Sequence, residues 1–507
     1  MTVRAGLGEV RRAGREGLAP FAAAPVAAVA GVVVAVLAAV SWRYGYHRDE
    51  LYYLQQSAHL AWGSVDSGPL VIAIARAASS CCQGALPALR LLSALAAGGT
   101  VALTALMARE LGGGRFAQWF AGLCIAAAGV LFGAGHLLST TPFDILAWAG
   151  ILLLALRLLR TGDTRLWLPL GVLVGAALLN KNTVFLLLSG LGVGLLATPR
   201  RRLLWSPWVV AGAFVAAAMW APSLAWHADH GWAMFEMSRN LRREHSGLGV
   251  AIAFLPLQLL LMNPVTAPVW LSGLVGLWRD PERGRCRPVP VAFVVLALVI
   301  AVVIGDRPYF LAPMYTALLA AGAVAFERRL AEGRARWSRR AASGVLVIGG
   351  LAALPVALPV LPASALRTMP LQHVNYDLGE QIGWQELSRT VVAAYRSLGR
   401  SDAVVVGSNY GEAGALARYG PPGIAGQAYS RQNTDWWYGP PPDDARSAVL
   451  IGFGRELVDR LWTDCRRFDR VGNAAGVDND EEGRPVWVCT GQRSPWSSTW
   501  PELRAYG

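Results

Sequence analysis

The stretch YHRDELYYLQQSAHLAWGSVDSGP, Tyr46–Pro69, directly follows an apolar run at Phe21–Trp42 that is long enough to cross a bilayer. It holds two adjacent carboxylates, Asp49 and Glu50, and a third carboxylate, Asp66, lies near its end. Acidic, basic and aromatic groups gathered this closely against a membrane span favour a catalytic or binding loop. The alternative is that the two acids only begin a helix, where the positive end of the helix dipole favours them.

The composition is that of a multi-span membrane protein. Of the 507 residues, 54% are hydrophobic and only 16% are charged, and the mean hydropathy is +0.38. A hydrocarbon core about 30 Å thick needs about 20 helical residues to cross it, and we expect about eleven spans. The predicted spans are Phe21–Trp42, Ala85–Ala108, Phe116–Ala134, Pro142–Leu159, Leu166–Asn180, Thr183–Ala197, Pro207–Trp226, Val250–Leu277, Pro290–Ile304, Tyr309–Phe326 and Ala341–Leu361.

The arginines predict how these spans are oriented. With the N-terminus inside, every predicted cytoplasmic segment is rich in arginine, whereas the opposite loops mix fewer arginines with acids, histidines and aromatics. This distribution follows the positive-inside rule. It accounts for much of the net charge of +13, so the charge requires no nucleic-acid partner. An odd number of spans places the C-terminal region outside the cytoplasm, and we expect a multi-pass protein of the cytoplasmic membrane.

Three regions are therefore predicted. Residues 1–20 form a basic cytoplasmic N-terminus, residues 21–367 a transmembrane domain whose first outer loop is 43–84, and residues 368–507 a small extracytoplasmic α/β domain. In the last region, apolar and amphipathic periodicities predict strands and helices. The strands are expected at Ala403–Gly407, Val449–Phe453 and Val486–Cys489, and the helices at Trp384–Leu398 and Glu456–Cys465.

The cysteines form no C-x-x-C pair and no spacing suited to zinc. Cys465 and Cys489 both lie in the predicted outer domain, where an oxidising compartment would allow a disulfide between them. Two free thiols in a small core are the alternative. A divalent metal ion near Asp49 is compatible with the acids of the first loop, although no ligand spacing requires one.

The spacing of the first loop predicts a short helix over residues 49–60. On such a helix Asp49, Tyr52, Tyr53 and Gln56 share one face. Glu50 points elsewhere and is free to hold the loop through hydrogen bonds or a salt bridge. This separation gives the two neighbouring acids different roles.

Ordered pieces of the chain resemble the dolichyl-phosphate-mannose protein mannosyltransferase superfamily (glycosyltransferase family 39), close to its bacterial, aminoarabinose-transferase-like branch. The matching pieces are HRDELYYL, WGSVDSGPL, LRLLSALAAGGTVALTALMARELGG, GHLLSTTPFDILAW, GAALLNKNTVFLLL, GDRPYFLAPMY, NYGEAGAL and WWYGP. One piece departs from the family pattern, because the usual Asp-x-Pro-Pro is Asp66-Ser67-Gly68-Pro69 here. We expect the loss of one proline to loosen this turn.

The resemblance implies a C-type glycosyltransferase fold and a polyprenyl-phosphate sugar donor at the outer membrane face. It also implies an inverting displacement in which Asp49 accepts the proton of an acceptor hydroxyl, or of an amine, as general base. Glu50 then has a supporting role, and Asp144 is a second acid lining the cavity. Which sugar is moved, and whether the acceptor is a protein, a lipid or a glycan, stays open.

The remaining site residues follow from the needs of this reaction. The leaving phosphate needs positive charge, which arginine and lysine supply; a snorkelling interfacial arginine is the alternative for Arg307. The phosphate-binding candidates are Arg307, Lys181, Arg242 and Arg243. The substrate-binding candidates are His47, Arg48, Tyr52, Tyr53, Gln56, Asp66 and Tyr309.

A membrane transporter, or a flippase for lipid-linked sugars, is the competing function class. Such proteins place broken helices and polar groups near the bilayer midplane, often in two repeated halves. This chain shows no internal repeat, and its polar groups cluster at one predicted face of the membrane. The pattern therefore favours the transferase.

Overall fold

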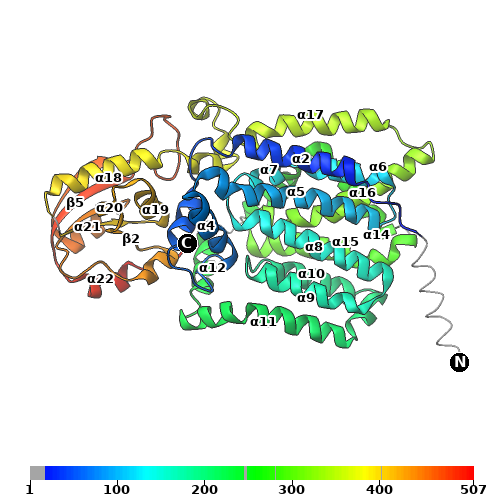
Figure 1. Ribbon diagram of the computed structural model, residues 1–507, viewed down its shortest axis with the longest axis horizontal. Helices are drawn as coiled ribbons and strands as arrows, with labels where there is room; N and C mark the ends of the chain where they lie inside the picture. Colours follow the sequence, from blue (N-terminus) through cyan, green and yellow to red (C-terminus); the bar gives the residue numbers. More distant parts are fainter. Residues whose placement is uncertain (1–16, 245–247, 280, 306, 401) are drawn as a thin grey trace.

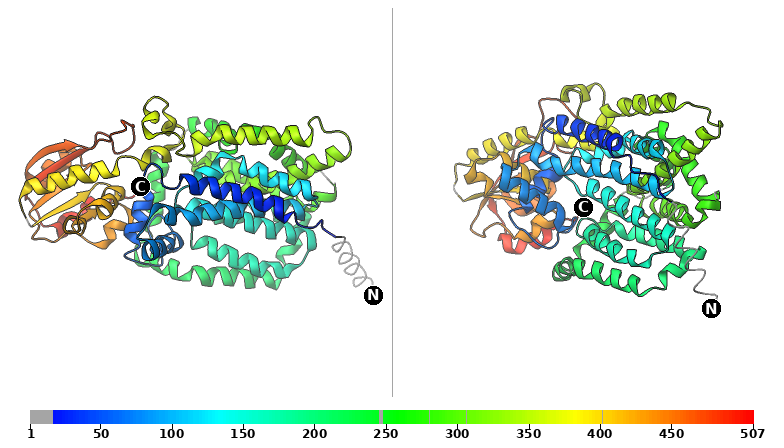
Figure 2. Two further views of the ribbon diagram at one scale, coloured as in Figure 1. Left: turned by 45° about the horizontal axis from the view of Figure 1, so that its top comes forward. Right: turned by 45° about the vertical axis from the view of Figure 1, so that its right-hand side comes forward.

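The computed structural model describes residues 17–244, 248–279, 281–305, 307–400 and 402–507. A bundle of long helices forms one part of the molecule, and a smaller domain with a β-sheet covers one end of that bundle (Figure 1). Two further views agree on this arrangement (Figure 2). The predicted basic N-terminus, 1–20, lies mostly outside the described residues.

The helices of the bundle correspond to the predicted apolar runs. They are α2 (Ala23–Val40), α5 (Leu86–Glu110), α6 (Arg115–Ala126), α7 (Gly129–Gly135), α8 (Thr140–Thr161), α9 (Trp167–Leu178), α10 (Val184–Leu196), α11 (Pro207–Asp229), α13 (Leu248–Met262), α14 (Ala267–Arg279), α15 (Pro288–Val299), α16 (Tyr315–Ala331) and α17 (Arg339–Ala357). The multi-span α-helical fold expected from the sequence is confirmed.

The number of spans depends on how broken helices are counted. Within the described residues, seven helices are long and apolar enough to cross a membrane, or up to nine if each of two bent pairs is one span. The bent pairs are α6 with α7, at 64°, and α13 with α14, at 86°. The two other predicted spans are the shorter apolar helices α9, of 12 residues, and α10, of 13 residues.

Small residues allow close helix packing in the bundle. A Cβ atom on Gly273 of α14 would overlap the carbonyl oxygen of Leu318 in α16, and one on Gly322 of α16 would overlap that of Val269 in α14. The two helices therefore approach backbone to backbone, as is common where lipid offers no hydrophobic drive for association.

The smaller domain is built on a five-stranded sheet of order β2-β1-β3-β5-β4. Its strands are β1 (Ala403–Gly407), β2 (Ala428–Ser430), β3 (Ser447–Ile451), β4 (Trp462–Arg470) and β5 (Pro485–Gln492). The first three are parallel, and β5 and β4 continue the sheet antiparallel. The expected small α/β domain is thus present at the end of the chain.

Successive residues of each central strand enter two different cores. Val405 and Val449 pack on one face with α18 (Trp384–Leu398) and α19 (Tyr410–Tyr419). Their neighbours Val404 and Leu450 pack on the other face with α21 (Arg455–Leu461) and α22 (Trp496–Leu503). The first of these cores continues into the outer end of the bundle, because the same cluster includes side chains of α3 (Arg48–Gln56) and α4 (Pro69–Cys82).

One predicted element of this domain is partly wrong. The helix expected at Glu456–Cys465 ends at Leu461 in α21, and strand β4 begins at Trp462. The strand lies at the edge of the sheet and exposes most of its side chains, so it lacks the apolar alternation that marks a half-buried strand. Cys465 and Cys489 face each other across β4 and β5 and are joined by a disulfide.

Helices α3, α4 and α12 (Ala233–Glu244) lie at the junction between the bundle and the sheet domain (Figure 1). The C-terminal residues of the chain return to this junction, where the amide nitrogen of Asn240 in α12 donates a 2.9 Å hydrogen bond to the carbonyl of Tyr506. The two parts of the molecule therefore meet over a surface that includes part of the first loop.

Candidate active site

The N-terminus of α3 holds both acids of the first loop in fixed directions. The Nδ1 atom of His47 accepts a 3.1 Å hydrogen bond from the backbone N–H of Asp49. The carboxylate of Glu50 in turn accepts a 2.9 Å hydrogen bond from the backbone N–H of His47. This reciprocal capping box starts the helix and turns the two neighbouring carboxylates away from each other.

Glu50 is a buried structural acid. Its carboxylate receives the guanidinium of Arg90 in α5 at 2.8 Å and 2.7 Å, and the backbone N–H of Leu138 at 2.9 Å. Burial favours a raised pKa, but the ion pair with Arg90 is stronger, and the pKa of Glu50 is lowered overall. Glu50 therefore fastens α3 to α5 and to the connection between α7 and α8, as its supporting role predicts.

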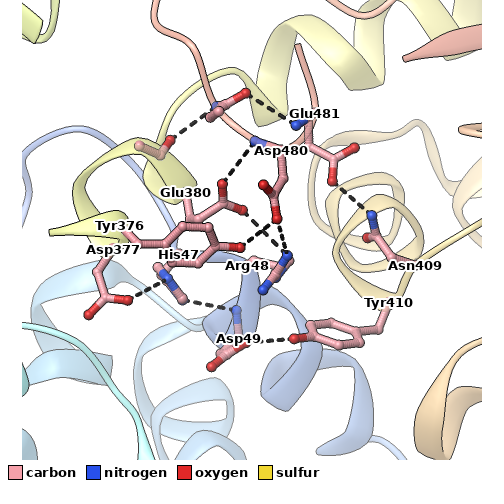
Figure 3. A network of polar contacts seen from close by, with 12 residues as sticks. His47, Arg48, Asp49, Tyr376, Asp377, Glu380, Asn409, Tyr410, Asp480 and Glu481 are labelled. Atoms are coloured by element: carbon pink, nitrogen blue, oxygen red, sulfur yellow. Dashed lines mark hydrogen bonds and ion pairs between the residues drawn. The ribbon is translucent and has the colours of Figure 1, made fainter. Parts of the chain in front are cut away.

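Asp49 points the other way, toward the sheet domain. Its Oδ1 atom accepts a 3.0 Å hydrogen bond from the hydroxyl of Tyr410, the first residue of α19 (Figure 3). The Tyr410 ring stacks on Tyr52 at 4.3 Å between centroids. Burial raises the pKa of Tyr410 well above its ordinary value, so the phenol stays protonated and remains a donor. A residue of the sheet domain thus orients the candidate base.

Arg48, which the sequence suggests as a substrate-binding residue, directs its charge to the C-terminal part of the chain. Its Nη1 atom lies 3.2 Å from Asp480 and 3.6 Å from the buried carboxylate of Glu380 (Figure 3). Its guanidinium also lies 5.5 Å from the ring centres of Tyr376 and Tyr410. These contacts tie the start of α3 to the sheet domain.

His47 makes a similar contact. Its Nε2 atom lies 3.5 Å from a carboxylate oxygen of Asp377, in the short helix η9 (Tyr376–Gln381). Burial favours a lower pKa for His47, but Asp377 and the neighbouring acids raise the pKa overall. Burial favours a higher pKa for Asp377, but the contact with His47 lowers the pKa of Asp377 overall. Because Nδ1 accepts the hydrogen bond from Asp49, the ring proton lies on Nε2, which faces the Asp377 carboxylate at the junction.

Asp66 joins the end of the first loop to α3. The hydroxyls of Tyr52 and Ser64 each donate a 3.1 Å hydrogen bond to its Oδ1 atom, and the amide of Asn433 donates a 2.9 Å bond to Oδ2. Burial, followed by the charge of Asp49, raises the pKa of Asp66 to about 6. A carboxyl with such a pKa can hold or release a proton near neutral pH.

Tyr53 and Gln56 lie on the same helix, at helical spacing from Asp49. Both are buried, and neither the amide oxygen nor the amide nitrogen of Gln56 has a hydrogen-bond partner among the described residues. Burial and the charge of Asp49 raise the pKa of Tyr53, with a smaller contribution from Tyr309. Tyr309 belongs to a second polar cluster.

This second cluster lies at the break between α9 and α10. The Lys181 Nζ atom lies 5.3 Å from the ring centre of Tyr309 and 4.9 Å from that of Phe310. Asp144 of α8 accepts a 2.8 Å hydrogen bond from the hydroxyl of Thr183 and is close enough to Lys181 to attract it. The sequence placed these residues in separate loops, and the structure brings them together.

The three candidate arginines are placed less completely. Arg307 precedes the short helix η6 (Pro308–Met314), whose first residues include Tyr309. Arg242 and Arg243 lie in the last turn of α12, and their side chains are outside the described residues. Among the described residues, no group of three or more His, Cys, Asp or Glu side chains is placed to hold a metal ion.

Comparisons with known proteins agree with this fold. Residues 66–226 match the family model described as dolichyl-phosphate-mannose-protein mannosyltransferase. The fold is similar to that of ArnT from Cupriavidus metallidurans bound to undecaprenyl phosphate, with a TM-score of 0.60 and 13% sequence identity over 91% of this chain and 97% of that chain. Residues 66–226 are therefore similar to that mannosyltransferase family, and the whole chain is similar in fold to ArnT.

The likeness extends to a second structure of the same relative. ArnT from Cupriavidus metallidurans in the apo state gives a TM-score of 0.58 and 14% identity over 95% of this chain and 99% of that chain. A search of curated protein sequences gives no significant match. The C-type glycosyltransferase fold expected from the sequence is confirmed.

The departure from the superfamily's Asp-x-Pro-Pro turn has a local explanation. The backbone N–H of Gly68 donates a 3.1 Å hydrogen bond to the carbonyl of Asn180, which a proline could not do. A Cβ atom at position 68 would also overlap the carbonyl oxygen of Leu179. The Ser64 hydroxyl bonds the backbone of Ser67 in the same turn. The turn is therefore held firmly against the α9–α10 break, rather than loosened as the missing proline suggests.

Arg90 and Tyr410 were not singled out by sequence reasoning. Arg90 carried a usable signal, because a charged side chain inside an apolar span needs a partner. Tyr410 lies in the quoted NYGEAGAL motif, but its approach to Asp49 depends on how the two parts of the chain pack. For Trp436 and Trp437, in the quoted WWYGP motif, the sequence leaves two alternatives open, stacking on a sugar or a place at the lipid interface. Their indole N–H groups are donated to Trp500 and Tyr506 within the sheet domain.

Proposed function

We propose that this protein is an inverting glycosyltransferase that moves a sugar from a polyprenyl-phosphate donor to an acceptor hydroxyl at the outer face of the cytoplasmic membrane. The observation that carries the proposal is the geometry of Asp49. This half-buried carboxylate is oriented by Tyr410 through one oxygen only, while the adjacent Glu50 is fully engaged with Arg90.

The chemistry follows from this division of roles. Tyr410 occupies Oδ1 of Asp49, so we assign Oδ2 to the acceptor hydroxyl. As the acceptor oxygen forms a bond to the anomeric carbon, its proton passes to Asp49 and the bond from that carbon to the phosphate oxygen breaks. The polyprenyl phosphate leaves with the bonding electrons, and the configuration of the anomeric carbon is inverted. General-base assistance of this kind contributes typically about 10²–10⁴-fold in rate.

The leaving phosphate needs a cationic site close to the base. We assign this role to Lys181 and Arg307, because Lys181 lies 5.3 Å from the ring centre of Tyr309 in η6 and Arg307 directly precedes that helix. The three N–H donors of a lysine suit a phosphate as a point charge. Asp144 would hold Lys181 in position and Tyr309 would face the substrate, while Arg242 and Arg243 stay candidates for the same anion.

The first-loop residues take two kinds of role in this scheme. Tyr52, Tyr53, Gln56 and Asp66 line the side of α3 on which Asp49 lies, and we keep them as substrate-binding residues. His47 and Arg48 make their contacts with Asp377, Glu380 and Asp480. We therefore propose that these two residues position α3 rather than bind substrate.

The proposed location rests on the arginine distribution and on the disulfide. The N-terminus would be cytoplasmic, and residues 368–507 would lie outside, where the bond between Cys465 and Cys489 would persist in an oxidising compartment. Residues 21–367 would then form the transmembrane transferase domain. The acceptor hydroxyl would come from a protein, a lipid or a glycan on that side.

A direct assay tests the proposal. Purified full-length protein in lipid nanodiscs is incubated with radiolabelled undecaprenyl-phosphate mannose, glucose or arabinose and an extract of envelope acceptors. We expect label to leave the lipid and join an acceptor with at least one donor. Absence of transfer with every donor, together with movement of a fluorescent lipid-linked sugar across proteoliposomes, would replace the transferase with a flippase.

A further inference from the structure

Asp435 is a buried carboxylate without a partner, close to the proposed catalytic loop. Its side chain is 3% exposed, and neither carboxylate oxygen has a hydrogen-bond partner among the described residues. Burial and the nearby charge of Asp66 raise the pKa of Asp435 well above its ordinary range. A buried polar group left unsatisfied is costly for stability, so such a group calls for a ligand or a function.

The direction of Asp435 follows from the short helix that carries it. Asp435 lies in η10 (Asn433–Tyr438), a 3₁₀ helix in which residues three apart share one side, so Asp435 and Tyr438 face the same way. The Tyr438 ring stacks on His59 of the first loop, with 4.5 Å between ring centres. Trp436, by contrast, points into the sheet domain and bonds Trp500. Asp435 therefore faces the first loop.

The same short helix is fastened to the residues around Asp49. Asn433 donates a hydrogen bond to Asp66, and the backbone N–H of Thr434 donates a 3.1 Å bond to the hydroxyl of Tyr52. The hydroxyl of Thr434 accepts a 2.9 Å bond from the backbone N–H of Val65. These bonds hold Asp435 next to Asp66, and Asp49 is near enough to Asp66 to raise its pKa.

We propose that Asp435 and Asp66 together bind adjacent hydroxyl groups of a sugar ring, with Tyr438 and His59 against its apolar face. The proposal rests on the proposed transferase function and adds to it a sugar-recognising residue from the sheet domain. The raised pKa keeps Asp435 protonated, so its carboxyl offers one O–H donor beside its acceptor oxygen, while Asp66 offers acceptor oxygens. This combination suits neighbouring hydroxyl groups, which both donate and accept, and aromatic rings supply apolar contact surface. The sugar is either that of the donor or one on the acceptor.

The test measures binding separately from turnover. Thermal stability of full-length protein in nanodiscs is recorded with undecaprenyl phosphate, with undecaprenyl-phosphate mannose, glucose or galactose, and with the free methyl glycosides. The sugar increment is the rise in Tm that the sugar alone adds, either over undecaprenyl phosphate or, for the methyl glycosides, over the protein without ligand. The phosphate increment is the rise in Tm with undecaprenyl phosphate. Both are compared between wild type, Asp435→Asn, Tyr438→Ala and the matched control Asp464→Asn. Asp464 is an exposed acid of the same domain, on the edge strand β4.

We expect Asp435→Asn to weaken sugar binding about threefold to tenfold, as loss of a hydrogen bond between neutral groups does, and to leave the phosphate increment unchanged. Tyr438→Ala should weaken it to a smaller extent, and Asp464→Asn should not change it. A sugar increment with the lipid-linked sugars assigns the site to the donor, and one with the methyl glycosides assigns it to the acceptor. Either supports the proposal.

Two results would overturn it. These are an unchanged sugar increment in Asp435→Asn, and no sugar increment in the wild type in either arm. Folding is checked from the thermal stability without ligand, which Asp435→Asn should not lower because it removes an uncompensated buried acid. Failure of the proposed function is a different result, namely no transfer by a wild-type protein that still binds the sugar through Asp435.

Discussion

The hydroxyl of Tyr410 lies 3.0 Å from the carboxylate of Asp49, although the two residues are 361 positions apart in the chain. One belongs to the loop that follows the first membrane helix, and the other starts a helix of the C-terminal sheet domain. The contact makes the sheet domain part of the candidate active site. Charged and aromatic contacts at the junction surround this hydrogen bond and hold the two elements that form it (Figure 3).

The role of Tyr410 as a positioning residue can be tested by removing its hydroxyl. Tyr410→Phe keeps the ring that stacks on Tyr52 but loses the hydrogen bond to Asp49. We expect a kcat roughly tenfold lower with a nearly unchanged KM, because the base is less well oriented while the substrate contacts remain. Tyr410→Leu should lower kcat further. Steady-state transfer kinetics measure both, and an unchanged kcat in Tyr410→Phe would contradict the assignment.

The ion pair of Glu50 and Arg90 should matter chiefly for stability. Glu50→Gln leaves the Arg90 guanidinium buried without its counter-charge, and breaking a buried pair in this way costs about 3–5 kcal/mol. Thermal unfolding of the detergent-solubilised protein measures the loss. The control is Glu332→Gln, which breaks an exposed pair with Arg334 and should cost less than about 1 kcal/mol. Equal effects of the two variants would argue against a structural role for Glu50.

Asp66 should give the folded protein a characteristic pH dependence. Its pKa is raised from an ordinary value of 3.8 to about 6 in the folded state. Between pH 3.8 and about 6, Asp66 is therefore protonated in the folded state and ionised in the unfolded state. The stability that this proton provides is present below pH 3.8 and is lost as pH rises through about 6. Asp66→Asn should remove this part of the pH dependence, so the difference in Tm between the two proteins should change across pH 4–7. A constant difference would refute the raised pKa.

Gly68 should tolerate no side chain. Gly68→Ala places a Cβ against the carbonyl of Leu179, and Gly68→Pro also loses the hydrogen bond to Asn180. We expect both variants to be destabilised by several kcal/mol, in the range of the largest point-mutant effects, and Gly68→Pro to be the worse. Gly133→Ala is the control, because a Cβ there meets nothing within 4 Å. Thermal unfolding ranks the three, and a stable Gly68→Pro would show that the family turn fits here after all.

The sequence could predict the elements that depend on local pattern. Every apolar run is helical, and α18 has the predicted bounds of Trp384–Leu398. The different directions of Asp49 and Glu50 also followed from helical spacing alone. Edge strand β4 was missed because its side chains are exposed on both faces, and the bent pairs were read as single spans because hydropathy does not record direction.

The long-range part of the site could not be predicted in the same way. Tyr410 and Asp435 meet the first loop only because the sheet domain packs on one end of the bundle, and Arg90 reaches Glu50 because α5 packs beside that loop. The sequence predicts that Arg48 makes polar contacts, but it does not predict its partners Glu380 and Asp480. A sequence shows a charge and not the group that the charge contacts. The cluster of Lys181, Asp144 and Tyr309 joins three loops whose proximity likewise depends on how the helices pack.

The account depends most on Asp49 as the base, and one measurement tests it most directly. Transfer from an undecaprenyl-phosphate sugar is compared between the wild type, Asp49→Asn and the control Asp459→Asn, which changes an exposed acid of α21. We predict that Asp49→Asn lowers the rate by about 10²–10⁴-fold while the affinity for the donor stays nearly unchanged, and that Asp459→Asn transfers at the wild-type rate. Wild-type transfer by a folded Asp49→Asn protein would contradict the central claim.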